Sequence, residues 1–540
     1  MTPRGWWNTL PMALPVVLGV IATTPGIPAV FAQSSAPAPV VTTDLGAVEG
    51  ARRDGVDVFL GIPFAAPPTG ERRLAPPAAP VAWTNPLRAV IAPSACPQTA
   101  SPDPAGLASN NEDCLYLNVW APMAAAQPRP VMVWIHGGGF VEGYSAAKQY
   151  DATRLAVRAN AVVVTVNYRV GALGFLAADA LDAADSRHVS GNYGLLDVQA
   201  ALRWVNRNAA AFGGDPRRIT VMGESAGANL VLGLLASPAS EGLFQRAIVQ
   251  SSTDGAHTVP LARAETQTYA RTLEEIGCGR GPGLLACLRA APVQSFLRMT
   301  VKPTMVQDGV VLPLDPFEAF QQGRFIRVPV LIGSNARENY LFTARLEFDV
   351  LKRHLKGEDL PGLLKASFGD KADAVAGQYA SDAYVNAATL IGSALTDRRF
   401  ACMANLARTG LAQHVPVFGY QLDIADPVQQ QPLMPGGDLP NLSYHTTDLG
   451  YVFDNDGDGQ KLIGRHASLS HMIADYWSAF AAEGDPNATA ERSVRVAWPR
   501  FMRDAPAMLS ISDAPTATGG FAAEHKCAFW EQSGLVATTW

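Results

Sequence analysis

The chain has 540 residues, of which 48% are hydrophobic and 17% are charged, and its formal net charge is −6. This composition excludes a disordered or fibrous chain and provides enough apolar material for a large core. The acidic balance, with no basic cluster against it, argues against a nucleic-acid partner.

The N-terminal segment has the order of a secretory signal. One cation, Arg4, precedes a mostly apolar run over residues 12–22, and small residues surround the expected cleavage position after Ala32. The run is short and contains a proline, so it does not predict stable membrane insertion, although an uncleaved N-terminal anchor is the alternative. We therefore expect a signal peptide at 1–32, a secreted or periplasmic protein, and one catalytic domain at 33–540.

The chain contains six cysteines, and in the oxidising compartments that an exported protein enters they would be expected to form three disulfides. Their spacing does not choose among the pairings that six cysteines allow. No CxxC or HExxH pattern occurs in the sequence, so neither a metal nor another cofactor is predicted. The cysteines are Cys96, Cys114, Cys278, Cys287, Cys402 and Cys527.

Several short apolar runs rich in β-branched residues predict buried parallel strands, because polar and apolar residues hardly alternate in them. Helical patterns lie between them at 195–212 and 228–236, and another covers 466–484. Strands that alternate with helices predict an α/β fold, with a mostly parallel sheet covered on both faces. The predicted strands are 131–136, 161–168, 219–223, 247–252, 328–335 and 415–422.

Ser225 lies in the sequence GESAG, between a predicted strand and a predicted helix. The GxSxG pattern alone is weak, since glycine is frequent in this chain. The strand–turn–helix context is that of a nucleophile elbow, whose turn is too sharp for a side chain at Gly223 or Gly227. The N-terminus of the following helix favours negative charge beside the serine. The sequence thus indicates Ser225 as a candidate nucleophile.

A reactive serine also needs donors for the oxyanion of its tetrahedral intermediate. Residues 134–140, WIHGGGF, end a predicted strand and open a loop of three glycines, which lets backbone N–H groups turn toward a ligand. We expect Gly138, Gly139 and Ala226 to form the oxyanion hole. A flexible linker is the alternative interpretation of the glycines.

Two longer segments resemble the signatures of the type B carboxylesterase family, the α/β-hydrolases that include the cholinesterases. They are FGGDPRRITVMGESAG at 212–227 and NEDCLYLNVW at 111–120. Further matching segments follow in the family's order, so the resemblance covers nearly the whole chain after the signal. It implies the α/β-hydrolase fold with inserted loops and the hydrolysis of small-molecule esters by a serine nucleophile. The further segments are 60–77, 166–176, 191–205 and 526–530.

The resemblance implies a triad in the chain order serine, acid, histidine. Glu338 aligns with the family's acid, although Arg337 and Asn339 stand where the family usually has Asp and Gly. Asp448 and Asp454 remain alternatives for the acid.

The family's base aligns with His445, which opens the segment HTTDLGYVF. Thr446 and Asp448 replace the usual Gly and Glu of that segment. Glu224, beside the nucleophile, is expected to shape the electric field around His445. His136 belongs to the glycine loop, where we expect its backbone rather than its imidazole to have a role. The other histidines have no catalytic setting.

The resemblance also implies pairings among the cysteines and between buried charges. The expected disulfides are Cys96–Cys114, Cys278–Cys287 and Cys402–Cys527. The expected ion pairs are Arg73–Glu112 and Arg169–Asp197.

The substrate is less constrained by the sequence. Residues 97–113 contain no aromatic residue, so the tryptophan with which cholinesterases bind choline is missing and a quaternary-ammonium alcohol is not expected. The whole chain also resembles the bacterial esterases that remove tricarballylate side chains from fumonisin mycotoxins. A polyanionic acyl group would need a nearby cation, for which Arg337 is the candidate. The alternatives are a general carboxylesterase or lipase for other environmental esters, and a non-catalytic cholinesterase-like binding protein; no oligomeric state is indicated.

Overall fold

The computed structural model describes residues 37–101, 106–123, 127–381, 386–428, 439–488 and 496–536. The predicted signal peptide at 1–32 lies outside the described residues. The chain from Ala38 to Trp540 forms one compact unit. Within the described ranges, no helix is both long enough and apolar enough to cross a membrane.

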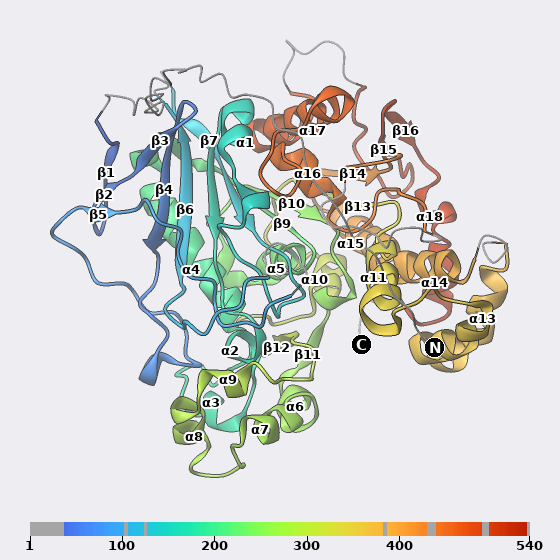
Figure 1. Cartoon of the computed structure of the whole chain (residues 1–540), viewed down its shortest axis with the longest axis horizontal. Coiled ribbons are helices and arrows are strands. Elements are labelled where there is room, and N and C mark those ends of the chain that lie inside the picture. The colour runs from blue at the N-terminus through green and yellow to red at the C-terminus, as the bar shows by residue number, and fades with distance from the viewer. Residues whose placement is uncertain are drawn as a thin grey trace, which may run out of the picture. The chain divides into compact units, whose positions relative to one another are not determined.

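An 11-stranded sheet runs through this unit (Figure 1). Its seven central strands, from β15 to β8, are parallel, and the strands at both edges are antiparallel to their neighbours. In spatial order the strands are β16 (Thr516–Thr518), β15 (Met508–Ile511), β14 (Val417–Leu422), β13 (Val330–Asn335), β10 (Arg246–Gln250), β9 (Gly214–Glu224), β7 (Arg129–Ile135), β8 (Val162–Val166), β6 (Tyr116–Pro122), β4 (Val56–Pro63) and β3 (Ala51–Arg53).

The predicted α/β fold is confirmed, and all the predicted strands lie in the parallel part of the sheet. The antiparallel strands β3, β4, β6 and β16 were not predicted. Strands β3 and β16 are short edge strands, and β3 and β4 carry the charged residues Arg52 and Asp57, so none of the three shows a continuous apolar run. Strand β6 is buried, but the polar residue Asn118 interrupts its apolar run.

The sheet separates two hydrophobic cores. Along β7, Val131, Val133 and Ile135 belong to one core, whereas Met132 and Trp134 belong to the other. Because successive side chains of a strand point to opposite faces, both faces of the sheet are dry. This burial explains why the parallel strands read as apolar runs without alternation.

Helices cover both faces. The first core contains residues of α4 (Tyr193–Asn208), α5 (Ala226–Ala236) and α10 (Pro316–Gln322). The second contains residues of α1 (Thr153–Ala159), α16 (Thr447–Phe453) and α17 (Gly464–Glu483). Helix α5 begins two residues earlier than the predicted range, directly after Ser225.

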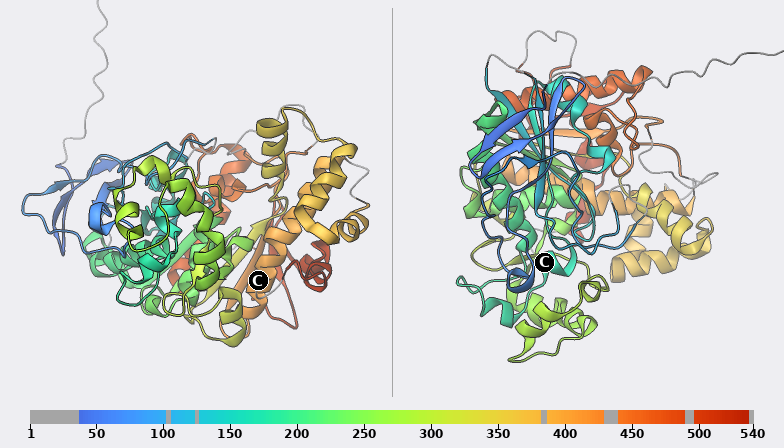
Figure 2. Two further views of the ribbon diagram at one scale, coloured as in Figure 1. Left: turned by 90° about the horizontal axis from the view of Figure 1, so that it is seen from below. Right: turned by 60° about the vertical axis from the view of Figure 1, so that its left-hand side comes forward.

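Two further groups of helices lie beyond the sheet (Figures 1 and 2). The first, at the bottom of Figure 1, comprises α6 (Leu261–Arg263), α7 (Ala270–Ile276), α8 (Leu284–Ala290) and α9 (Val293–Phe296). The second, at the right, comprises α11 (Tyr340–Arg345), α12 (Leu360–Phe368), α13 (Ala372–Gln378) and α14 (Ala387–Thr396).

The three disulfides and the two ion pairs implied by the family resemblance are present. The disulfides join Cys96 to Cys114, Cys278 to Cys287, and Cys402 to Cys527. Arg169 makes a buried bidentate contact with Asp197, with both N–O distances at 2.7 Å. Arg73 binds Glu112 and also donates to backbone carbonyls of the first helical group, for example Ala291 O at 2.6 Å.

Loss of the Cys402–Cys527 disulfide should be the most destabilising of the three. It links positions 125 residues apart, whereas Cys278 and Cys287 are 9 apart. On the chain-entropy model, the double variant Cys402→Ala/Cys527→Ala should lose about 4–5 kcal/mol of unfolding free energy, and Cys278→Ala/Cys287→Ala about 2–3 kcal/mol. Urea unfolding of both variants measures this; equal losses would contradict the loop-length argument.

Candidate active site

Ser225 sits at the sharp turn between β9 and α5. Its backbone has φ 56° and ψ −121°, a conformation that a non-glycine residue adopts only when its surroundings enforce it. The Ser225 N–H donates to Gln250 O at 2.9 Å, which ties the turn to β10. A Cβ at Gly227 would lie 2.1 Å from Ile135 O, and one at Gly223 would lie 2.6 Å from the Gly227 carbonyl carbon. The glycines are therefore required for the elbow to form.

Three side chains far apart in the sequence form a continuous hydrogen-bonded line. Ser225 Oγ lies 2.9 Å from His445 Nε2, and His445 Nδ1 lies 2.7 Å from Glu338 Oε2. Glu338 follows β13, and His445 precedes α16. Both side chains are buried, and the second carboxylate oxygen of Glu338 accepts the Asn335 N–H at 2.6 Å. Since Glu338 is held by its backbone neighbour, its other oxygen is aimed at the imidazole.

Glu224 also contacts the imidazole. Its Oε1 lies 3.2 Å from His445 Nε2, and the residue is almost fully buried. The same ring nitrogen therefore faces both the Ser225 hydroxyl and a carboxylate. Positive charge on His445 would be stabilised from two sides, by Glu224 and by Glu338.

Within the described part of the chain, neither Asp448 nor Asp454 hydrogen-bonds to His445. Asp448 accepts from Gln250 Nε2 at 2.5 Å and from Asn335 Nδ2 at 3.3 Å. Burial, reinforced by the nearby Glu338, raises the pKa of Asp448. Asp454 lines a separate cavity, away from Ser225.

The glycine loop lies beside the serine. Gly138 and Gly139 have φ values of 102° and 61°, and both line the same cavity as Ser225 and Ala226. A Cβ at Gly138 would lie 2.2 Å from Glu142 O. The N–H groups of Gly138, Gly139 and Ala226 donate to no acceptor among the described residues. These donors are available to an oxyanion bound at Ser225.

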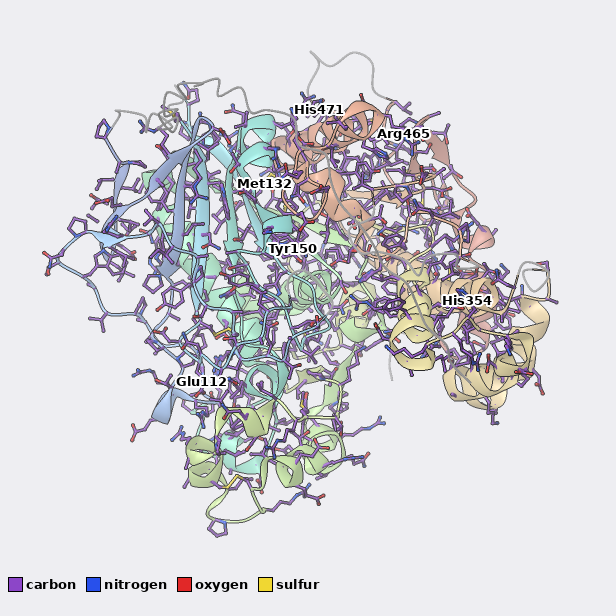
Figure 3. The ribbon with its side chains drawn as sticks, in the orientation of Figure 1. Glu112, Met132, Tyr150, His354, Arg465 and His471 are labelled. Atoms are coloured by element: carbon purple, nitrogen blue, oxygen red, sulfur yellow. A yellow bond between two sulfur atoms is a disulfide. The ribbon has the colours of Figure 1, made fainter. Side chains whose placement is uncertain are left out.

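The cavity above Ser225 has a volume of about 450 Å³. Tyr150, which lines it, lies near the middle of the molecule in Figure 3. The wall of the cavity is largely apolar and aromatic, which suits an organic ester that makes few polar contacts. The apolar lining residues are Phe140, Val141, Tyr150, Met299, Val301, Leu341, Phe342 and Phe400.

Three cations also line the cavity, and none was identified from the sequence. Lys302 lies in the loop after α9, Arg345 in α11, and Arg399 in a π-helical turn over 397–401. The three residues come from separate segments, so no local sequence pattern predicts that they line one cavity. Arg337, the cation proposed from the sequence, is not among the lining residues; its guanidinium donates to the Ala336 carbonyl.

His136 has a structural environment. It is buried beside the glycine loop, and its ring stacks on Tyr168 with centroids 4.4 Å apart. Burial lowers the pKa of His136 from 6.5 to about 4, although the Gly137 carbonyl opposes this shift. The folded state thus keeps this imidazole neutral at neutral pH.

His136 should make the protein less stable in acid. The unfolded chain binds a proton there near pH 6.5 and the folded chain only near pH 4, so stability falls as the pH drops between those values. The full loss is about 3 kcal/mol. Unfolding free energies measured from pH 7 to 4 should show a flatter slope for His136→Asn than for the exposed control His188→Asn. Identical slopes would contradict this assignment.

Within the described ranges, no group of three or more His, Cys, Asp or Glu side chains could hold a metal ion.

Comparison with known proteins gives one consistent family. The model of the Carboxylesterase family matches residues 37–530. The chain is 35% identical over 489 residues to fumonisin B1 esterase of Sphingopyxis macrogoltabida, covering 88% of this chain and 86% of that one. It is 34% identical over 484 residues to para-nitrobenzyl esterase of Bacillus subtilis (strain 168), covering 86% and 92%. A solved structure titled PNB esterase superposes with a TM-score of 0.75 at 31% identity, covering 93% of this chain and all of that one.

Proposed function

The chain belongs to the carboxylesterase family and is a carboxylic ester hydrolase, and from this premise we propose that Ser225, His445 and Glu338 are its catalytic triad. The observation that carries the proposal is the hydrogen-bonded line from Ser225 Oγ through both ring nitrogens of His445 to Glu338 Oε2. A nucleophile, a base and a group that orients the base are the parts that acyl transfer to serine requires.

In the acylation step, His445 Nε2 takes the Ser225 proton while Oγ attacks the ester carbonyl. The N–H groups of Gly138, Gly139 and Ala226 bind the oxyanion of the tetrahedral intermediate. The imidazolium then gives its proton to the leaving alcohol, and an acyl-enzyme remains on Ser225.

In the second step, water attacks the acyl-enzyme, and His445 serves again as base and then as acid. Glu338 holds the Nδ1–H tautomer, and with Glu224 it stabilises the imidazolium in both steps. The released acid and the free serine complete the cycle.

A serine-reactive phosphonate tests the proposal against a non-catalytic binding protein with the same fold. One adduct at Ser225, found by mass spectrometry of the digested protein, supports an activated nucleophile. An intact chain without an adduct under conditions that label a known serine esterase would reject it.

For the substrate we propose tricarballylate esters of the fumonisin type, with a general esterase or lipase activity on other environmental esters as the alternative. The support is the likeness to fumonisin B1 esterase over most of both chains. Incubation with fumonisin B1 should release tricarballylic acid, which mass spectrometry detects. Hydrolysis of simple aryl esters without any such release favours the alternative.

We propose further that residues 1–32 are removed on export and that 33–540 form one catalytic domain in the periplasm or outside the cell. The three disulfides support an oxidising compartment. The mature protein recovered from the natural host should begin at Gln33; a retained N-terminus would indicate an anchor.

A further inference from the structure

Arg399 is held against the catalytic histidine through a pair of aromatic rings. Its guanidinium carbon lies 5.8 Å from the ring centre of Phe342 and 5.7 Å from that of Phe400. The same two rings lie 5.1 Å and 5.0 Å from the imidazole of His445. Packing on aromatic faces fixes a guanidinium without using its N–H donors. Arg399 is therefore a positioned cation in the wall next to the reaction centre.

The donors of Arg399 are only partly used. Its Nε contacts Asp254 Oδ1 at 3.5 Å, at the limit of a hydrogen bond. Its two terminal nitrogens donate to no acceptor within the described part of the chain, and the residue lines the cavity. Two parallel N–H donors of this kind match the two oxygens of a carboxylate.

The surrounding charge is also positive. Asp254 is shared with Arg398, whose Nη1 lies 3.9 Å from Asp254 Oδ2, so one carboxylate serves two guanidinium groups. Lys302 stands in the same field. The residue is exposed, and it lines the cavity. Desolvation by the surrounding protein lowers the pKa of its amine; Asp254 opposes this shift, and Arg399 and Arg398 add to it. Lys302 makes no hydrogen bond or ion pair with the other residues that the structure describes.

The acids of the cavity lie elsewhere. Glu224 contacts His445, and Glu142 follows the glycine loop, where its backbone N–H donates to Gly138 O. The cavity is therefore divided by charge, with carboxylates beside the reacting groups and cations on the wall formed by Lys302 and Arg399. An ester with a remote negative charge fits this division.

We propose that Arg399 and Lys302 form a carboxylate-binding subsite, so that the preferred substrates carry a free carboxylate on the acyl group in addition to the ester that is cleaved. Arg399 binds the carboxylate through its two terminal nitrogens, and Lys302 contributes a second positive charge at the cavity wall. This inference rests on the proposed serine-esterase function, but it does not require the alcohol to be a fumonisin.

Two aryl esters that differ in one charge test the subsite. The first is the 4-nitrophenyl ester of glutaric acid with its second carboxylate free, and the second is the same compound with that carboxylate methylated. Wild type, Arg399→Gln and Lys302→Gln are compared with Arg271→Gln, which removes an exposed arginine that is also paired with a carboxylate, Glu275. Ser225→Ala provides the blank.

The expected result is a loss of about 10- to 100-fold in kcat/KM for the anionic ester in Arg399→Gln and Lys302→Gln, the range of one or two charge-assisted hydrogen bonds. The methylated ester should change by less than about 3-fold, and Arg271→Gln should leave both rates unchanged. Added salt should lower the rate of wild type with the anionic ester more than with the neutral one.

Equal losses on both esters, or no loss on either, would overturn the subsite while leaving the esterase mechanism in place. If Arg399→Gln disturbs Phe342 and Phe400, Lys302→Gln decides, because Lys302 is exposed and, within the part of the chain that the structure describes, makes no cation–π contact with either ring. A wild-type enzyme that hydrolyses neither ester, or an active Ser225→Ala variant, would instead count against the proposed function itself.

Discussion

Ser225→Ala is expected to lower kcat by about 10⁴- to 10⁶-fold, because no other group at the elbow can form the acyl-enzyme. The oxyanion donors and the cavity remain in this variant, so residual catalysis by water is expected rather than complete loss. The substitution also removes only a hydroxyl whose partner is His445. Stability should therefore change little, and steady-state rates with an aryl ester measure catalysis alone.

Ser468→Ala serves as the matched control, since it removes an exposed hydroxyl on α17, far along the chain from the elbow. Its rate should equal that of wild type. Retention of more than about one hundredth of the wild-type kcat by Ser225→Ala would show that the ester is cleaved without this nucleophile.

The sequence was informative where physical constraints are local. Parallel strands buried on both faces must be apolar at every position, so the strands of the sheet centre could be predicted from their composition. The elbow could be predicted because its two glycines are forced by contacts with Ile135 and with each other. Strands β3, β4 and β16 were missed because short or half-exposed strands tolerate charged and polar residues, and β6 was missed because the polar residue Asn118 interrupts its apolar run. Helix α5 was placed two residues late because Ala226 and Gly227 carry no apolar pattern.

The wall of the cavity could not be predicted for a different reason. Lys302, Arg345 and Arg399 are ordinary charged residues in their own segments, and only the packing of those segments brings them around one space. The contacts of Gln250 could not be predicted for the same reason. Its backbone carbonyl accepts the Ser225 N–H, and its side chain donates to Asp448 and accepts from Trp477 Nε1 at 3.0 Å. Such convergence depends on tertiary structure, which no local pattern encodes.

Glu338→Gln is expected to reduce kcat by about 10³- to 10⁴-fold. In the enzyme, Glu338 accepts two N–H donors, one from Asn335 and one from His445 Nδ1. A glutamine has one carbonyl oxygen, so its NH₂ group must face one of these donors whichever way the amide is turned. If it faces His445, the Nδ1–H tautomer loses its acceptor. If it faces Asn335, the loop after β13 is strained and the negative charge opposite the imidazolium is still lost.

Asp448→Asn separates the role of the acid from that of a buried support. Asp448 accepts from the side-chain amides of Gln250 and Asn335, so the variant should loosen the layer beneath the triad without removing the acceptor of His445. We expect a loss in kcat of about 10-fold or less, with a lower unfolding free energy, because a mispaired buried amide costs about 1–3 kcal/mol.

Measured kcat values for both variants decide between the acids: a larger loss in Asp448→Asn than in Glu338→Gln would transfer the orienting role to Asp448. The geometry favours Glu338, because its carboxylate has one oxygen fixed by the Asn335 backbone and the other 2.7 Å from the ring nitrogen that must be oriented.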